Sequence, residues 1–365
     1  MLKAHNNPHS RLSKTGGGRN SNLEILRIVS MCLVMMLHYL PTRLIPSATS
    51  IRTNFWESLL NLELRSIAFV AVNCFVLISG YFGINWKIKS FSSLIFRILF
   101  WSLISYIFAK GVTPAVLKET YTYSGHVISN IFTLRWFIGA YLCLYIFSPV
   151  LNAFLNNTDQ RQLGLFLIAF YALSTVIGWV LKSHEFYEGM SMLALSGLYL
   201  IGGYIKRFSL KILNFNHWVD LSIYISIGFI LVILSAAAYY FNAEKSLYGY
   251  LNPLVIIQSI YLFLFFKKLK IDKSRFINIV AASSFSVYLF HTDICSRPLW
   301  YYGCNMINTL GPICSLFMIG IFFAAIFLFC VIVDFVGTLV FDAGEKLLLN
   351  GDKLLRKVTA GNLKS

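Results

Sequence analysis

The stretch LEILRIVSMCLVMMLHYL, residues 23–40, is apolar enough to cross a membrane, yet it contains Glu24, Arg27 and His38. Ionisable groups in hydrocarbon are costly unless they face a bundle interior or a water-filled cavity, so they indicate a functional site. Arg27 and His38 are eleven positions apart. In an α-helix this spacing places them ~16 Å apart along the axis and within ~20° of the same face. The stretch therefore predicts a transmembrane helix with a cation near one membrane surface and an imidazole near the other.

The composition of the whole chain is that of a membrane protein. Hydrophobic residues make up 57% of the 365 residues and charged residues only 13%, and the mean hydropathy is +0.69. Apolar stretches long enough to cross ~30 Å of hydrocarbon recur throughout the sequence. We expect an all-α, polytopic protein with about ten spans, at 23–41, 66–84, 91–109, 134–155, 163–181, 190–205, 219–241, 249–266, 277–295 and 311–341.

The distribution of charge predicts the orientation. With ten spans, the two tails and alternate loops share one side, and these segments hold 20 Lys and Arg residues against 5 Asp and Glu. The opposite loops hold 8 against 6. By the positive-inside rule the first side is cytoplasmic, so both termini are expected in the cytoplasm. Topology then accounts for the formal charge of +16, and nucleic acid is not expected as a partner.

Three regions are expected along the chain: a basic N-terminal tail at 1–22, a transmembrane domain at 23–341 and a basic C-terminal tail at 342–365. The first tail lacks the apolar core of a cleavable signal peptide. In a helix, residues 343–358 would carry leucines on one side and lysines on the opposite side, as expected of a helix that lies on the inner leaflet. No Cys or His spacing indicates a metal site. Cys295 and Cys304 fall at the outer edges of neighbouring spans, where pairing stays open.

Polar side chains near the membrane surfaces form two predicted clusters. The cytoplasmic cluster has more cations than carboxylates, as phosphate-binding sites do. The outer cluster contains groups suited to proton transfer and to stacking on a sugar ring. The inner members are Glu24, Arg27, Ser79, Tyr81, Lys87, Lys89 and Arg97, and the outer members are His38, Arg135, Trp136, Tyr288 and His291. The alternatives are an internal Glu24–Arg27 ion pair and an Arg97 that snorkels to lipid headgroups.

Four segments in this order resemble the membrane-bound acyltransferase-3 family, whose members acylate bacterial surface glycans and some small molecules. The most specific is the Arg-x10-His pattern formed by Arg27 and His38. VNCFVLISGYFGI (72–84) is similar to the second-span signature of the family. TLRWFIGAYLCLYIFSPVLN (133–152) resembles its fourth span and SSFSVYLFHTDI (283–294) its late Ser-x-x-x-Tyr-Leu-x-His element. The resemblance covers roughly residues 20–340.

The resemblance implies an acyl-CoA-dependent O-acyltransferase in the bacterial cytoplasmic membrane. Acyl-CoA, with acetyl as the expected acyl group, would be a cytoplasmic co-substrate rather than a permanently bound cofactor. The acceptor would be a hydroxyl of an extracytoplasmic or lipid-linked glycan. His38 would be the catalytic base, with Arg27 and Glu24 in the same site. The donor would contact Arg27, Arg97, Lys87, Lys89, Ser79 and Tyr81, and the acceptor Trp136, Arg135, Tyr288 and His291.

One feature of the sequence departs from that family. Relatives often carry two arginines three positions apart after the second span, but position 94 is Leu94 and only Arg97 remains. Lys87 and Lys89 are the expected substitutes. The alternative function is a multispan transporter or flippase of glycan intermediates, in which Arg27 and His38 line the substrate path. Against it, we find no internal duplication and no paired broken helices.

Overall fold

The computed structural model describes residues 21–42, 46–117, 135–208, 215–242 and 247–362. All regular secondary structure in these ranges is helical, which confirms the all-α prediction. The helices are α2 (Ser21–Tyr39), η1 (Leu40–Thr42), α3 (Ala48–Thr53), α4 (Phe55–Phe69), α5 (Ala71–Phe82), α6 (Ile88–Leu117), α8 (Trp136–Asn157), α9 (Gln160–Ser174), η2 (Thr175–Val180), η3 (Tyr187–Gly189), α10 (Met192–Arg207), α11 (His217–Tyr240), α12 (Pro253–Lys268), α13 (Arg275–Ala282), α14 (Ser284–Thr292), α15 (Arg297–Asn308) and α16 (Pro312–Asn362).

Helices long and apolar enough to span a bilayer make the chain a multi-pass membrane protein. Within the described residues there are seven, and they are Ser21–Tyr39, Phe55–Phe82, Ile88–Val112, Trp136–Asn157, Gln160–Val180, His217–Tyr240 and Cys314–Gly344. The second is α4 and α5 together, so the expected outer loop at 42–65 is largely helical.

The remaining three of the ten expected spans correspond to shorter helices. Helices α10 and α12 have 16 residues each. The stretch 277–295 is not one helix, because the chain turns at Ser283 between the 8-residue α13 and the 9-residue α14. Helices buried among other helices need not match the bilayer thickness, because the protein rather than lipid surrounds them. The count of ten is therefore not confirmed, and the orientation of the termini stays a prediction.

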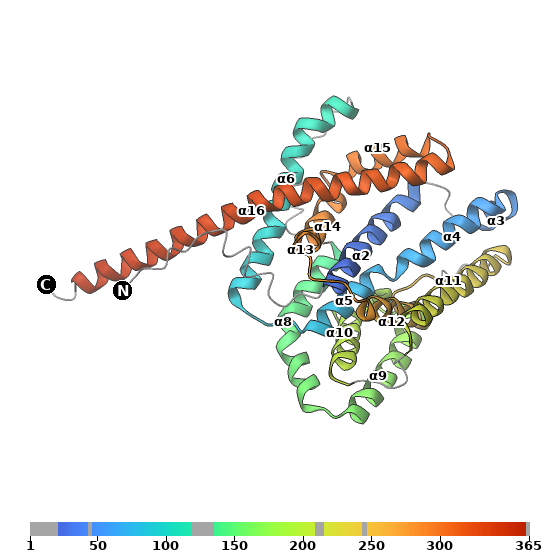
Figure 1. Cartoon of the computed structure of the whole chain (residues 1–365), viewed down its shortest axis with the longest axis horizontal. Helices are drawn as coiled ribbons and strands as arrows, with labels where there is room; N and C mark the ends of the chain where they lie inside the picture. The colour runs from blue at the N-terminus through green and yellow to red at the C-terminus, as the bar shows by residue number, and fades with distance from the viewer. Residues whose placement is uncertain (1–20, 43–45, 118–134, 209–214, 243–246, 363–365) are drawn as a thin grey trace.

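Helix α2 lies in the middle of the bundle. It packs against α4, α5, α12, α13 and α14, and Figure 1 shows it between the α4–α5 pair and the α13–α14 region. Its first turn is tied to the neighbouring chain: the Asn22 amide donates to the carbonyls of Lys267 and Leu269, and the Ser21 hydroxyl accepts from the Ser274 amide. The start of α2 is thereby fixed beside the end of α12.

Helices α5 and α10 approach each other closely at glycine residues. A Cβ atom built on Gly80 would lie 2.0 Å from the Tyr199 carbonyl oxygen, and one on Gly202 would lie 2.3 Å from that of Leu77. Between helices in lipid there is little hydrophobic driving force, so small residues that let backbones touch are a main source of packing energy. Gly80, the centre of the Ser79-Gly80-Tyr81 motif, is thus required for the α5–α10 contact.

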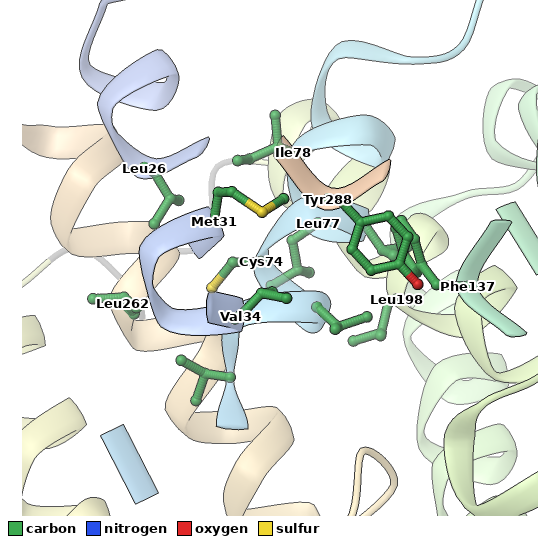
Figure 2. Packing of buried hydrophobic residues seen from close by; sticks show 14 of the residues in the cluster. Leu26, Met31, Val34, Cys74, Leu77, Ile78, Phe137, Leu198, Leu262 and Tyr288 are labelled. Atoms are coloured by element: carbon green, nitrogen blue, oxygen red, sulfur yellow. The ribbon is translucent and has the colours of Figure 1, made fainter. Parts of the chain in front are cut away.

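The core around α2 is closely packed. Figure 2 shows Met31 and Val34 of α2 beside Cys74 of α5, and the ring of Tyr288 beside that of Phe137. The last two rings meet edge to face with their centroids 5.4 Å apart, a favourable aromatic geometry. This contact joins α8 to α14 beside the core around α2.

The structure describes most of the expected C-terminal tail but little of the expected N-terminal tail. Residues 1–20 of the expected N-terminal tail lie outside the described residues. Helix α16 continues without interruption through residues 343–358 to Asn362 (Figure 1), so the backbone of that segment is helical. Its location on the inner leaflet stays a prediction, as do the three regions expected from the sequence.

Candidate active site

Two histidines meet at the end of α2. The Nδ1 atom of His38 lies 2.9 Å from the Nε2 atom of His291, which comes from the last turn of α14. The other ring nitrogen of His291 lies 2.6 Å from the carbonyl oxygen of Val287, one turn earlier in the same helix. His291 is only 2% exposed. Two residues separated by 253 positions in sequence therefore form one hydrogen-bonded unit.

The Val287 carbonyl determines which nitrogen atoms of His291 and, through it, of His38 carry protons. A carbonyl oxygen only accepts, so Nδ1 of His291 carries a proton. Burial disfavours a second proton on His291, because a charged group is costly away from water. Its Nε2 is then an acceptor, and Nδ1 of His38 donates to it. Nε2 of His38 is left with a free lone pair, which is the state that a general base requires.

A cavity of about 220 Å³ adjoins His38. Its wall combines apolar side chains with a few polar ones, as is typical of ligand sites. The lining residues are Met31, Val34, Leu37, His38, Pro41, Arg65, Phe69, Val72, Phe75, Trp136, Phe137, Tyr250 and Tyr288. His291 is not among them, so it supports His38 from behind. Of the outer residues expected from the sequence, the structure brings His38, Trp136 and Tyr288 to one cavity.

One wall of this cavity is aromatic. The ring of Tyr250 is stacked on Phe69, with centroids 4.8 Å apart, and lies 5.4 Å from the ring of Trp136. Phe137 and Tyr288 continue the wall. Such faces suit stacking with the apolar face of a sugar ring. Tyr250 was missed from the sequence because a tyrosine near a span end is typical of a membrane interface.

Arg135 clamps the helix that carries His291. Its Nη1 atom donates to the carbonyl of Leu289 at 2.7 Å and to the hydroxyl of Thr292 at 2.6 Å, and its Nη2 atom lies 3.6 Å from a carboxylate oxygen of Asp293. A cation at a helix C-terminus also interacts favourably with the helix dipole. Arg135 does not line the cavity, so the contacts place it as a support of α14.

Arg27 occupies the other end of α2. Its Nη1 atom lies 3.2 Å from both carboxylate oxygens of Glu24, which is 1% exposed. This is the internal ion pair that the sequence left open. The Arg27 guanidinium also lies 6.0 Å from the centroid of the Phe82 ring. Arg27 is therefore outside the His38 cavity and beside the end of α5.

A second, larger hollow begins at Phe82. It has a volume of about 830 Å³. It is lined by the end of α5 and the residues that follow, together with parts of α8 and α10. The lining residues are Gly80, Tyr81, Phe82, Gly83, Ile84, Asn85, Trp86, Pro149, Asn152, Leu155, Asn156, Gly203, Lys206 and Arg207. The His38 end of α2 lines the first cavity, and Arg27 near the other end lies beside Phe82, which lines the second hollow.

Cations gather around Tyr81 at the edge of this second hollow. The Lys206 ammonium lies 4.7 Å and the Lys267 ammonium 5.7 Å from the centroid of the Tyr81 ring. Desolvation, together with the ammonium groups of Lys268 and Lys206, lowers the pKa of Lys267. Like charges held together in this way favour an anionic ligand. From the sequence alone, Lys206 and Lys267 served only as evidence for topology.

The other cations expected at this end are placed differently. The Nη1 atom of Arg97 donates to the carbonyl of Ala282 at 3.1 Å, where it completes the end of α13. Lys87 and Lys89 are exposed beside the start of α6 and do not line the hollow. The cationic surplus therefore comes from α10 and α12 rather than from the loop before α6.

Ser79 lies between the two hollows. Along α5 it comes after Phe75, which lines the His38 cavity, and directly before Gly80, which lines the larger hollow. Its hydroxyl is 2.9 Å from the Phe75 carbonyl and 3.2 Å from the Tyr141 hydroxyl. A pair of hydroxyls in contact thus lies between the α5 residues that line the two hollows.

The cysteines do not contribute a disulfide. All seven are free thiols, and these include Cys295 and Cys304, whose pairing the sequence left open.

Comparison with known proteins agrees with this geometry. The acyltransferase-3 family, described as an acyltransferase domain, matches residues 20–336. The match includes α2 with both its ends, both hollows and α14. The chain belongs to this family and is a membrane acyltransferase, as the four sequence segments predicted. No curated protein and no solved structure shows a significant match to it.

Proposed function

We propose that the protein transfers an acyl group, most simply acetyl, from acyl-CoA in the cytoplasm to a hydroxyl of an extracytoplasmic or lipid-linked glycan. Its location would be the bacterial cell membrane. The single observation that carries this proposal is the His38–His291 contact at a cavity inside a membrane acyltransferase. Acyl transfer to an alcohol needs a neutral base with a free lone pair, and the hydrogen-bond order of this pair supplies one.

His38 acts in both halves of the proposed reaction. Its Nε2 atom removes the proton of the acceptor hydroxyl as the oxygen attacks the thioester carbonyl. The new C–O bond forms, the C–S bond breaks, and the CoA sulfur leaves with the proton returned by His38. While His38 carries the additional proton, its Nδ1–H donates to the neutral Nε2 of His291. His291 is thus a positioning residue.

The donor nucleotide is assigned to the larger hollow. Its volume of about 830 Å³ falls in the range of ~300–1,000 Å³ usual for cofactor-sized sites. Lys206 and Arg207 offer cations for phosphates, and Trp86 offers a ring face for adenine. Arg27, held by Glu24 beside Phe82, stands at the edge of this hollow.

The thioester arm is proposed to pass Ser79. Phosphates cannot enter the hydrocarbon, so the nucleotide stays at the cytoplasmic end while the narrow pantetheine arm extends inward. The distance along α5 from Gly80 to Phe75 is five residues, or ~8 Å. The arm therefore needs only this short passage to bring the thioester into the cavity beside His38.

The acceptor sugar is assigned to the aromatic wall. Trp136 and Tyr288 lie in the cavity with His38, whereas Arg135 and His291 act through α14 and through His38. The outer residues are thus of two kinds: those that contact the sugar and those that position His38 and α14.

Donor labelling tests the proposal. Membrane vesicles containing the protein are given acetyl-CoA labelled in the acetyl group, together with glycan from cells that lack the protein. We expect label on the glycan with the wild type and none with His38→Ala at equal protein in the membrane. Label transfer that persists with His38→Ala would overturn the assignment of the base. Arg27→Ala should chiefly weaken the use of donor, and a defect that vanishes at saturating donor indicates a binding role.

A further inference from the structure

Arg65 is a cation in the His38 cavity that has no role in the reaction described above. It belongs to the last two turns of α4, and its side chain lines the cavity. Its Nε atom is buried and has no hydrogen-bond partner among the described residues. A guanidinium is always charged and presents five N–H donors. Arg65 is partly exposed, but leaving its buried Nε–H donor unpaired is costly, so we take the position as suited to a ligand rather than to the fold alone.

The helix axes place Arg65 on the outer side of the cavity. Helices α2 and α4–α5 run in opposite directions past it, since Arg27 near the start of α2 lies beside Phe82 at the end of α5. Along α2 and the following η1 the lining runs from Met31 to Pro41, and along α4–α5 it runs from Phe75 back to Arg65. Each of these is ten residues, or ~15 Å of helix. Met31 therefore lies level with Phe75 at the apolar inner end, while Pro41 lies level with Arg65 at the outer end.

The cavity thus has two chemically different ends. The inner end, lined by Met31, Val34, Val72 and Phe75, is apolar and suits an acyl chain or thioester arm. The outer end holds Arg65 near the level of His38, on the side from which an extracytoplasmic acceptor would enter. Arg65 is consequently placed to contact the acceptor and not the nucleotide of the donor.

We infer that the glycan acceptor carries an anionic group, a carboxylate or a phosphate, close to the hydroxyl that is acylated, and that Arg65 binds this group. The inference rests on the proposed function. Arginine matches both oxyanions because its planar fork donates two parallel hydrogen bonds. In a partly desolvated cavity such a bond also orients the sugar, so that only one hydroxyl reaches Nε2 of His38.

The test compares acceptors before it compares variants. Glycan from cells lacking the protein is offered to wild-type vesicles in three forms: untreated, with its carboxylates reduced to alcohols, and with its phosphates removed. We expect the loss of one class of anion to lower acetyl incorporation by roughly tenfold or more, as is typical of a charge-assisted hydrogen bond. Whichever treatment does so identifies carboxylate or phosphate as the group.

Variants of Arg65 complete the test. Arg65→Gln should lower incorporation into untreated glycan to the level of the treated glycan, and Arg65→Lys should retain part of it. The control is Arg52→Gln: this arginine of α3 is exposed, donates to the Tyr240 carbonyl and does not line the cavity. Equal labelling of treated and untreated glycan by the wild type, or unchanged labelling by Arg65→Gln, would overturn the inference while leaving the proposed function intact. Absence of wild-type labelling on every glycan would instead refute both.

Discussion

Removing the hydrogen-bond partner of His38, without touching His38 itself, is the sharpest perturbation that the site offers. His291→Phe keeps a ring between Tyr288 and Trp300, whose centroids lie 6.1 and 5.1 Å from that of His291. It deletes the Nε2 acceptor that faces His38 at 2.9 Å. His291→Gln keeps an oxygen that can accept from His38, so the two variants separate packing from hydrogen bonding.

The size of the effect follows from the charge that His38 gains during the reaction. A hydrogen bond to a charged group contributes roughly 1.5–3 kcal/mol, so its loss should slow the turnover by roughly 10- to 150-fold. Removing the base itself with His38→Ala forfeits general base catalysis, which contributes about 10²- to 10⁴-fold. The expected order of turnover is wild type, His291→Gln, His291→Phe and finally His38→Ala.

The assay is steady-state acetyl transfer in vesicles, with kcat and KM measured separately for donor and acceptor. We expect His291→Phe to lower kcat and to leave the KM for acetyl-CoA unchanged, because the larger hollow, which we propose holds the nucleotide, is lined by other residues. The matched control is His217→Phe, since this histidine packs against Trp218 at the start of α11 and lines neither hollow. A kcat within threefold of the wild type in His291→Phe would refute the positioning role of His291, and a change in KM alone would reduce His291 to a packing residue.

Three further outcomes follow from contacts elsewhere in the bundle. Gly80→Ala should lower the thermal unfolding midpoint of the detergent-solubilised protein, because the added Cβ would lie 2.0 Å from a backbone oxygen of α10. Such overpacking costs about 1–3 kcal/mol of stability. The control is Gly320→Ala, since no atom lies within 4 Å of a Cβ added there. Lys206→Gln should raise the KM for acetyl-CoA about tenfold with little change in kcat, whereas equal effects on both would contradict a binding role. Desolvation and neighbouring ammonium groups lower the pKa of Lys267 below 10.5, so its charge is lost earlier as the pH rises. The wild-type KM for acetyl-CoA should therefore increase at alkaline pH, and a profile that stays unchanged with Lys267→Arg would contradict this.

Much of the site was accessible from sequence because lipid makes polar residues conspicuous. Arg27 and His38 stand out in an apolar run, and the structure places them beside two different hollows that border the same helix. Trp136 and Tyr288 share the cavity with His38 as expected. For Arg27 and His38, the cost of placing an ionisable group in hydrocarbon carried the prediction, whereas Trp136 and Tyr288 were expected from their place at the same membrane surface as His38.

Other features could not be read from the sequence. Arg65 was counted in an outer loop because charge normally marks a loop, yet it lies within the continuous span Phe55–Phe82. Lys206 and Lys267 were read only as markers of the cytoplasmic side, and their meeting around Tyr81 depends on the packing of α10 and α12 against α5. The nucleotide-sized hollow has no local signature, since it is formed by segments from three parts of the chain.

The sequence by itself indicated a helical membrane protein, because hydropathy is a local property of a segment, and four of its segments resembled the acyltransferase-3 family, which the family match confirmed. It also singled out His38, because an ionisable group is conspicuous within one apolar segment. Only the tertiary structure decided which groups act together: that His291 supports His38 instead of lining the cavity, and that Arg65 shares the cavity with it. These pairings depend on contacts between distant segments, such as the glycine-mediated approach of α5 and α10. Packing between helices fixes such contacts, and no single helix contains the information.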